Sequence, residues 1–145
     1  MKKMLWTTFL TALFGCGGGG VNVQPYIGLW TSVGNEIETC NSVPHNTSLN
    51  GLLTIAQGAS PADVVTNAPN GCDLTWSVSG NTASLKGSQT CAVSGSAGGI
   101  WTATFTSGSL TLSGNAISYS DQGTGVLNTA PAIQCTFTQA GTFTR

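Results

Sequence analysis

Few side chains in this chain of 145 residues could act as catalytic acids, bases or nucleophile activators. His45 is the single histidine, and it lies in a polar stretch, 44–47, that is typical of a loop. Glu36 and Glu38 lie two residues apart, so they would project from the same face of a strand. Such a pair could bind a cation weakly or act as an acid and a base.

A solvated strand end is the simpler interpretation of these two glutamates, and we expect it here. A serine nucleophile beside His45 would need a sequence such as G-x-S-x-G, which the chain does not contain. We therefore predict no catalytic residue, no cofactor and no enzymatic activity.

The five cysteines indicate disulfides rather than a metal site. The chain has no C-x-x-C pair, and one histidine cannot complete a usual zinc set, so we predict no metal. Apart from Cys16, which lies in the hydrophobic start of the chain, the cysteines are Cys40, Cys72, Cys91 and Cys135. An even set in an exported protein favours two disulfides.

Four cysteines allow three pairings, and one weak argument favours one of them. If a first strand around Trp30 runs antiparallel to a last strand ending at Arg145, paired residues share one sum of residue numbers. Cys40 and Cys135 have the same sum as Trp30 and Arg145, so they would lie side by side.

The remaining bridge would then join Cys72 to Cys91. A β-bulge at 33–35 would shift this register, and the alternation does look broken there, because Glu36 and Glu38 share the parity of the tryptophan. The other two pairings therefore stay open.

The start of the chain is typical of a secretory signal. Lys2 and Lys3 precede a short apolar stretch, 4–14, that is too short to span a bilayer as a helix. The stretch ends in Leu13-Phe14-Gly15-Cys16, which resembles the lipobox of bacterial lipoproteins. That resemblance implies that residues 1–15 are a signal peptide and that Cys16 carries acyl chains.

The same resemblance implies a location. Residues 16–25 are rich in glycine and would tether the folded part to the membrane. Gly17, rather than an aspartate, follows Cys16. In the sorting pattern of lipoproteins in double-membrane bacteria, this implies export to the outer membrane. Anchoring would come from the lipid on Cys16, since removal of the signal leaves only Lys86 and Arg145 as cations.

Charge excludes one class of partner. Only 6% of the residues are charged, and the whole chain has four basic residues and a formal net charge of −1. Nucleic-acid binding needs a basic patch that this composition does not supply.

From residue 26 onward, apolar and hydroxylic residues alternate, as in the run from Trp101 to Thr106. This period of two is typical of strands with one buried and one wet face. Gly80-Asn81 and Gly114-Asn115 suit two-residue hairpins. We predict one all-β domain at 26–145, an antiparallel meander of about eight to ten strands that closes into a barrel. A two-sheet sandwich is the alternative.

Gly28-Leu29-Trp30 resembles the G-x-W element of lipocalin-like barrels, in which the tryptophan closes one end beneath a basic residue of the last strand. The resemblance implies that Arg145 stacks on Trp30; a core tryptophan with a solvated arginine is the alternative. Trp76 and Trp101 share the parity of core residues and are expected in the core. The pattern as a whole is also similar to small outer-membrane lipoproteins, from which no activity can be carried over.

Two functions follow as hypotheses. The first is a non-enzymatic outer-membrane lipoprotein, anchored at Cys16, that binds another protein of the cell envelope. The alternative is a lipocalin-like carrier that holds a small apolar ligand inside the barrel.

Overall fold

The computed structural model describes residues 20–68, 71–94 and 100–145. The predicted signal peptide, the lipobox and Cys16 lie outside these residues. Within the described ranges, no helix has the length and hydropathy needed to cross a bilayer.

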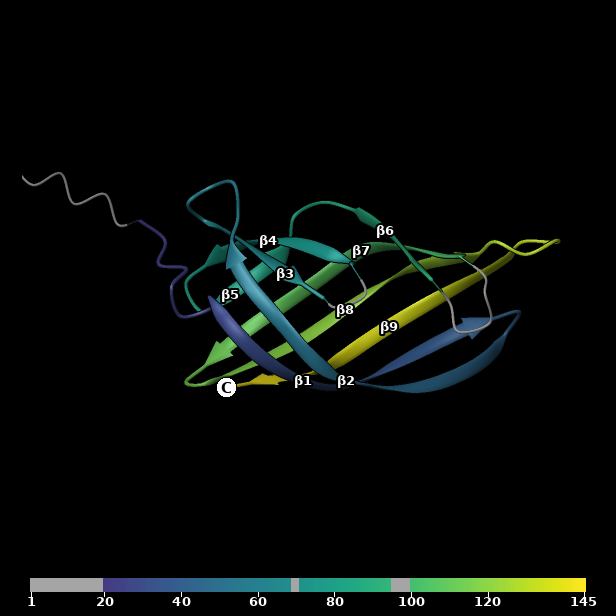
Figure 1. The fold of residues 1–145 in the computed structure, drawn as a ribbon, viewed down its shortest axis with the longest axis horizontal. Helices are drawn as coiled ribbons and strands as arrows, with labels where there is room; N and C mark the ends of the chain where they lie inside the picture. Colours follow the sequence, from purple (N-terminus) through teal and green to yellow (C-terminus); the bar gives the residue numbers. More distant parts are fainter. Residues whose placement is uncertain (1–19, 69–70, 95–99) are drawn as a thin grey trace, which may run out of the picture.

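The described residues form nine strands (Figure 1). In chain order they are β1 (Gly28–Cys40), β2 (Val43–Gln57), β3 (Asp63–Asn67), β4 (Asp73–Ser79), β5 (Thr82–Leu85), β6 (Gln89–Ser94), β7 (Ile100–Ser113), β8 (Ala116–Leu127) and β9 (Ile133–Thr144). All pairings between them are antiparallel.

Hydrogen bonds close the sheet into a ring. The strand order is β5-β4-β3-β2-β1-β9-β8-β7-β6, and β5 also pairs with β7. Strand β6 pairs with the first part of β7, at 100–105, and β5 pairs with its later part, at 109–111. Strand β8 takes the other edge of β7, so β5 and β6 share one edge. This ring confirms the predicted all-β, barrel-like fold rather than the two-sheet alternative.

Two-residue turns connect several pairs of consecutive strands. Gly80 and Gly114 have φ of 62° and 58°, as the predicted two-residue turns require of their first central residue. A third hairpin turns at Asn41 and Ser42, which both have positive φ, 50° and 67°. This turn joins β1 directly to β2, so His45 lies in a strand. The prediction that His45 lies in a loop is therefore wrong.

The register between β1 and β9 runs without interruption from Thr31 opposite Thr144 to Cys40 opposite Cys135. The bulge considered at 33–35 is therefore absent from this pairing. The disulfides are Cys40–Cys135 and Cys72–Cys91, the pairing that the register argument favours.

A disulfide and a glutamine side chain join β6 to β4. Cys91 of β6 is bonded to Cys72, which directly precedes β4. Gln89 accepts a hydrogen bond from the Thr75 backbone nitrogen (2.8 Å) and donates one to the Thr75 carbonyl (2.7 Å). The disulfide and the two hydrogen bonds therefore hold β6 beside β4, where the chain passes from β5 to β6.

Inward-facing side chains form one core, and Trp76 is buried in it while Trp101 packs against it partly exposed. The largest fully buried side chains are Trp30, Trp76, Tyr26, Ile55, Leu110, Ile117 and Val64. Val23 is buried too, and its carbonyl accepts a hydrogen bond from the Tyr26 nitrogen (3.0 Å). The folded part thus includes Val23, which lies inside the segment 16–25 predicted as a tether.

Candidate functional site

The barrel contains a cavity of about 360 Å³ whose lining is mostly aliphatic and aromatic. Its apolar lining residues include Leu53, Leu74, Trp76, Phe105, Leu110 and Phe143. The indole of Trp76 is fixed by a hydrogen bond from its Nε1 to Thr66 Oγ1 (3.1 Å). The cavity therefore has a rigid apolar wall, which is the usual character of sites for small molecules.

The cavity reaches an open edge of the sheet. Strand β2 pairs with β3 only through 54–57, and its residues 43–53 pair on one side alone, with β1, in the described part of the chain. Exposed residues of that free edge, among them Gly51 and Leu52, line the cavity. A ligand could enter there without disrupting backbone pairing.

Polar side chains cross the inner wall in one row. Asp121 of β8 is opposite Gln139 of β9, which is opposite Glu36 of β1. The Gln139 amide donates a hydrogen bond to Glu36 Oε2. The register thus builds an acid, an amide and a second acid from three strands, and Asp121 and Gln139 line the cavity itself.

Asp121 is the unusual member of this row. Its side chain is buried, with the residue 6% exposed, and its Oδ1 has no hydrogen-bond partner in the described residues. Burial first, and the negative charge of Glu36 second, raise the pKa of Asp121 to about 7. A buried polar atom without a partner is rare in folded proteins, and among the carboxyl groups of the described residues Asp121 has such an atom in the cavity wall.

Tyr119 forms the wall next to Asp121. Its ring stacks on Phe143 with centroids 4.5 Å apart. It lies so close to Gly34 that a Cβ there would sit 2.1 Å from the tyrosine oxygen, so glycine makes room for the ring. Burial raises the pKa of Tyr119, a hydrogen bond with Ser32 opposes that rise, and the carboxylates of Asp121 and Glu36 add to it.

A second depression, of about 330 Å³, lies where β7 and β8 are irregular. The register shifts between Phe105 and Ser107, and Ser107, Ser109 and Asp121 are among the lining residues. Asp121 therefore lines both hollows, because its neighbour across the strands is Gly108, which has no side chain to separate them.

The residues of the G-x-W element lie together at the end of the barrel where β1 begins and β9 ends. The Arg145 guanidinium carbon lies 4.2 Å from the centre of the Trp30 ring. One guanidinium nitrogen donates to the carbonyls of Pro25 (2.9 Å) and Ile27 (2.8 Å). The Arg145 side chain also passes 3.6 Å from where a Cβ of Gly28 would lie. At this end of the barrel, Arg145 therefore lies over Trp30 and is held by two backbone carbonyls.

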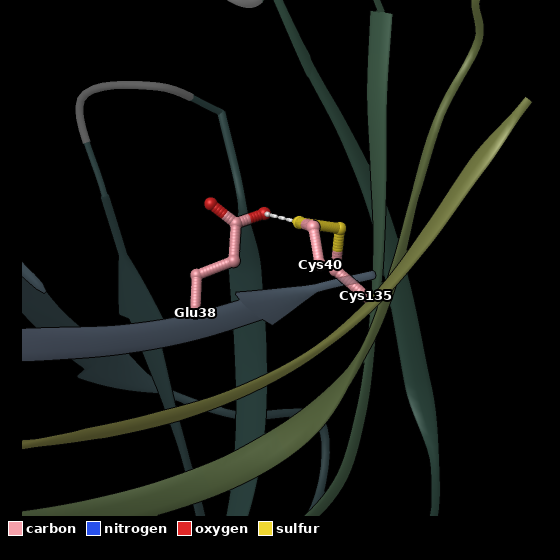
Figure 2. Close-up of side chains that lie close together, drawn as sticks. All are labelled: Glu38, Cys40 and Cys135. Atoms are coloured by element: carbon pink, nitrogen blue, oxygen red, sulfur yellow. Dashed lines mark hydrogen bonds between the residues drawn. A yellow bond between two sulfur atoms is a disulfide. The ribbon is translucent and has the colours of Figure 1, made fainter. Parts of the chain in front are cut away.

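Glu38 lies at the opposite end, beside the Cys40–Cys135 disulfide (Figure 2). Its Oε1 is 3.4 Å from Cys40 Sγ, and the three side chains are close enough to resemble a metal-ligand set. Both sulfurs are bonded to each other, however, so neither offers a thiolate. These three residues do not form a metal site while the disulfide is intact.

The two glutamates face inward and are half-buried, so the predicted solvated strand end is wrong. Burial and then the charge of Glu36 raise the pKa of Glu38, while His45, its exposed neighbour across the strands, lowers it. The structure therefore brings His45 and Glu38 together across β1 and β2.

Sequence reasoning missed Asp121, Gln139 and Tyr119. One signal was present: Asp121 continues the inward parity of Ile117 and Tyr119, where an apolar residue is expected. No protein-family model, no curated protein and no solved structure matches this chain.

Proposed function

We propose that this protein binds a small, mostly apolar ligand inside its barrel. The observation that carries this proposal is the apolar cavity of about 360 Å³ with one buried, unpartnered carboxyl oxygen in its wall. Pockets for small molecules are typically of this size, apolar, and equipped with a few fixed polar groups. A ligand that enters would bury its apolar surface and supply the partner that Asp121 lacks.

The place of action that we propose is the bacterial outer membrane, with the barrel anchored by lipid on Cys16. The sequence resemblance to a lipobox supports this location. Two disulfides are compatible with it, because they form and persist in oxidising compartments outside the cytoplasm. A barrel held at a membrane surface could sequester a ligand or pass it on.

Binding can be tested with phenylnaphthylamine, an uncharged apolar fluorophore. We expect its fluorescence to rise on addition of the purified protein, since the cavity would exclude water around it. Ala68→Phe places a ring in the cavity lining and should weaken binding at least about tenfold. Ala140→Phe is the matched control: its site is exposed and outside the lining, so binding should not change. Equal binding by both variants would contradict a luminal site.

Protein binding is the second candidate function, and the outer face of β1 and β2 favours it. Leu29, Val33 and Ile37 on β1 and Leu52 on β2 are exposed by 62%, 55%, 49% and 55%. The register sets Leu52 opposite Thr31, between Leu29 and Val33, and Ile37 follows on the same face of β1 beyond Asn35. We call these four apolar side chains the exposed stripe. Exposed apolar patches often mark interaction sites, and the proposed occupant is another protein of the cell envelope.

Site-specific photocrosslinking in intact envelopes would test this second function. A crosslinker at Val33 should give one adduct of defined mass, because the side chain lies in the exposed stripe. Ser118, exposed on β8 outside the stripe, is the control position and should give none. Identical adducts from both positions would indicate random contact and would remove the support for this partner.

A further inference from the structure

Hydrogen bonding within the polar row leaves one oxygen of Asp121, Oδ1, without a donor. Gln139 is the only neighbour in the row with N–H groups, and its amide nitrogen donates to Glu36. Asp121 Oδ1 is left buried with no partner in the described residues. A buried carboxyl oxygen in that state costs free energy, and a donor from a ligand would recover it.

The charges around the cavity favour one kind of donor. Asp121 and Glu36 face each other across Gln139, and the electrostatic effect of Glu36 on Asp121 is repulsive. The two cations in the described residues are occupied elsewhere: Lys86 pairs with Asp63, and Arg145 lies over Trp30 where β1 begins. An anionic group would be repelled from the row, whereas a cation would be attracted to both carboxyl groups.

We infer that the ligand is an amphiphile with a protonated amine, whose ammonium group pairs with Asp121 while its apolar body lies against Trp76 and Phe105. This inference rests on the proposed ligand-binding function. An ammonium group has three donors, and after one reaches Asp121 Oδ1 the oxygens of Gln139 and Tyr119 in the same lining can accept the others. A charge-assisted bond of this kind is about twice as strong as a neutral one.

The affinity for such an amine should depend on pH. Asp121 is ionised increasingly as the pH rises through about 7, and an alkylammonium group stays protonated to about pH 10. Amine binding therefore strengthens as the pH rises through about 7. It stays strong up to about pH 10, because both charges are present in that range. The titratable groups that face Asp121 are Tyr119 on its own strand and Glu36 on β1. Strand β9 places Gln139 opposite it, β7 places Gly108 opposite it, and Trp76 of β4 lies beside Gly108.

Three compounds with one carbon skeleton test the inference: phenylbutylamine, phenylbutanol and phenylbutanoate. Isothermal titration at about pH 8 should show the amine binding at least about tenfold more tightly than the alcohol, with the acid weakest. Asp121→Asn should weaken amine binding at least about tenfold and change alcohol binding by less than about threefold. Asp73→Asn removes one carboxyl group from an exposed site on β4, so it should change neither.

The outcomes separate the two proposals. Amine preference that is lost in Asp121→Asn but kept in Asp73→Asn supports the inference. Equal binding of amine and alcohol by the wild type overturns it and leaves an apolar carrier standing. Failure of all three compounds and of phenylnaphthylamine to bind overturns both. If Asp121→Asn does not fold, the loss of amine affinity of the wild type between about pH 8 and pH 5 is the readout, and a flat profile contradicts the inference.

Discussion

Asp121→Asn is expected to raise the free energy of unfolding by up to about 4 kcal/mol at about pH 8 and to change it little at about pH 4. The pKa of Asp121 is about 7 in the folded protein, against an ordinary value of 3.8. Between these values the folded state holds a proton that the unfolded state releases. The stability of the wild type therefore falls as the pH rises through this window and stays low above it.

Asparagine cannot ionise, so the variant does not incur this loss. One pKa unit corresponds to about 1.4 kcal/mol, which sets the size of the expected difference. Urea unfolding of ligand-free protein across this pH range measures it, since a bound amine would hold Asp121 in its charged form. The raised pKa of Glu38 acts in the same direction in both proteins and cancels in the difference.

Asp73→Asn again serves as the control, because that carboxyl group is exposed. Its stability should stay within about 0.5 kcal/mol of the wild type at every pH. If the difference in the free energy of unfolding between Asp121→Asn and the wild type does not vary with pH, the raised pKa of Asp121 is contradicted.

Trp30→Ala is expected to lower the free energy of unfolding by about 3–5 kcal/mol, a large part of the stability of an ordinary domain. Trp30 is 1% exposed, and its Nε1 donates to the Tyr26 carbonyl (2.8 Å). Truncation would leave a cavity beneath Arg145 and a buried carbonyl without its donor. Urea unfolding at constant pH measures the loss.

Arg145→Met separates the contribution of the arginine from that of the buried Trp30. The arginine is exposed, so the loss of its contact with the Trp30 ring and of its two hydrogen bonds to backbone carbonyls should together cost only about 1–2 kcal/mol. Trp30→Phe keeps an aromatic ring in the core and should fall between the two variants. A loss below about 1 kcal/mol for Trp30→Ala would contradict the assignment of this residue to the core.

Local patterns predicted much of the fold. Alternation gave the strands, and glycine turns at Gly80 and Gly114 placed two hairpins correctly. The register of β1 on β9 is the one obtained by placing Trp30 opposite Arg145, which also places Cys40 opposite Cys135. Alternation alone could not select it, because a shift by two residues keeps every side chain on the same face. The turn at Asn41 and Ser42 was missed, because serine rarely adopts positive φ and the pair lacks the glycine of the usual two-residue hairpin turn.

The candidate site was hidden for a different reason. Glu36 broke the expected alternation, and a bulge was the local explanation for that break. The strand is regular, and the acid faces inward because it belongs to the polar row with Gln139 and Asp121. Those partners come from β9 and β8, about a hundred residues along the chain, and only closure of the ring brings them together. No local pattern contains that information.

The pairing of β1 with β9 has a consequence for how the chain folds. The ring cannot close until residues more than 90 positions apart meet, as Cys40 and Cys135 do at a separation of 95. Folds dominated by such distant contacts form slowly, on a scale of about milliseconds to seconds. Early oxidation of Cys40 and Cys135 would hold the two strands together and remove much of that search. The folding rate of this barrel should therefore depend on the redox state of its surroundings.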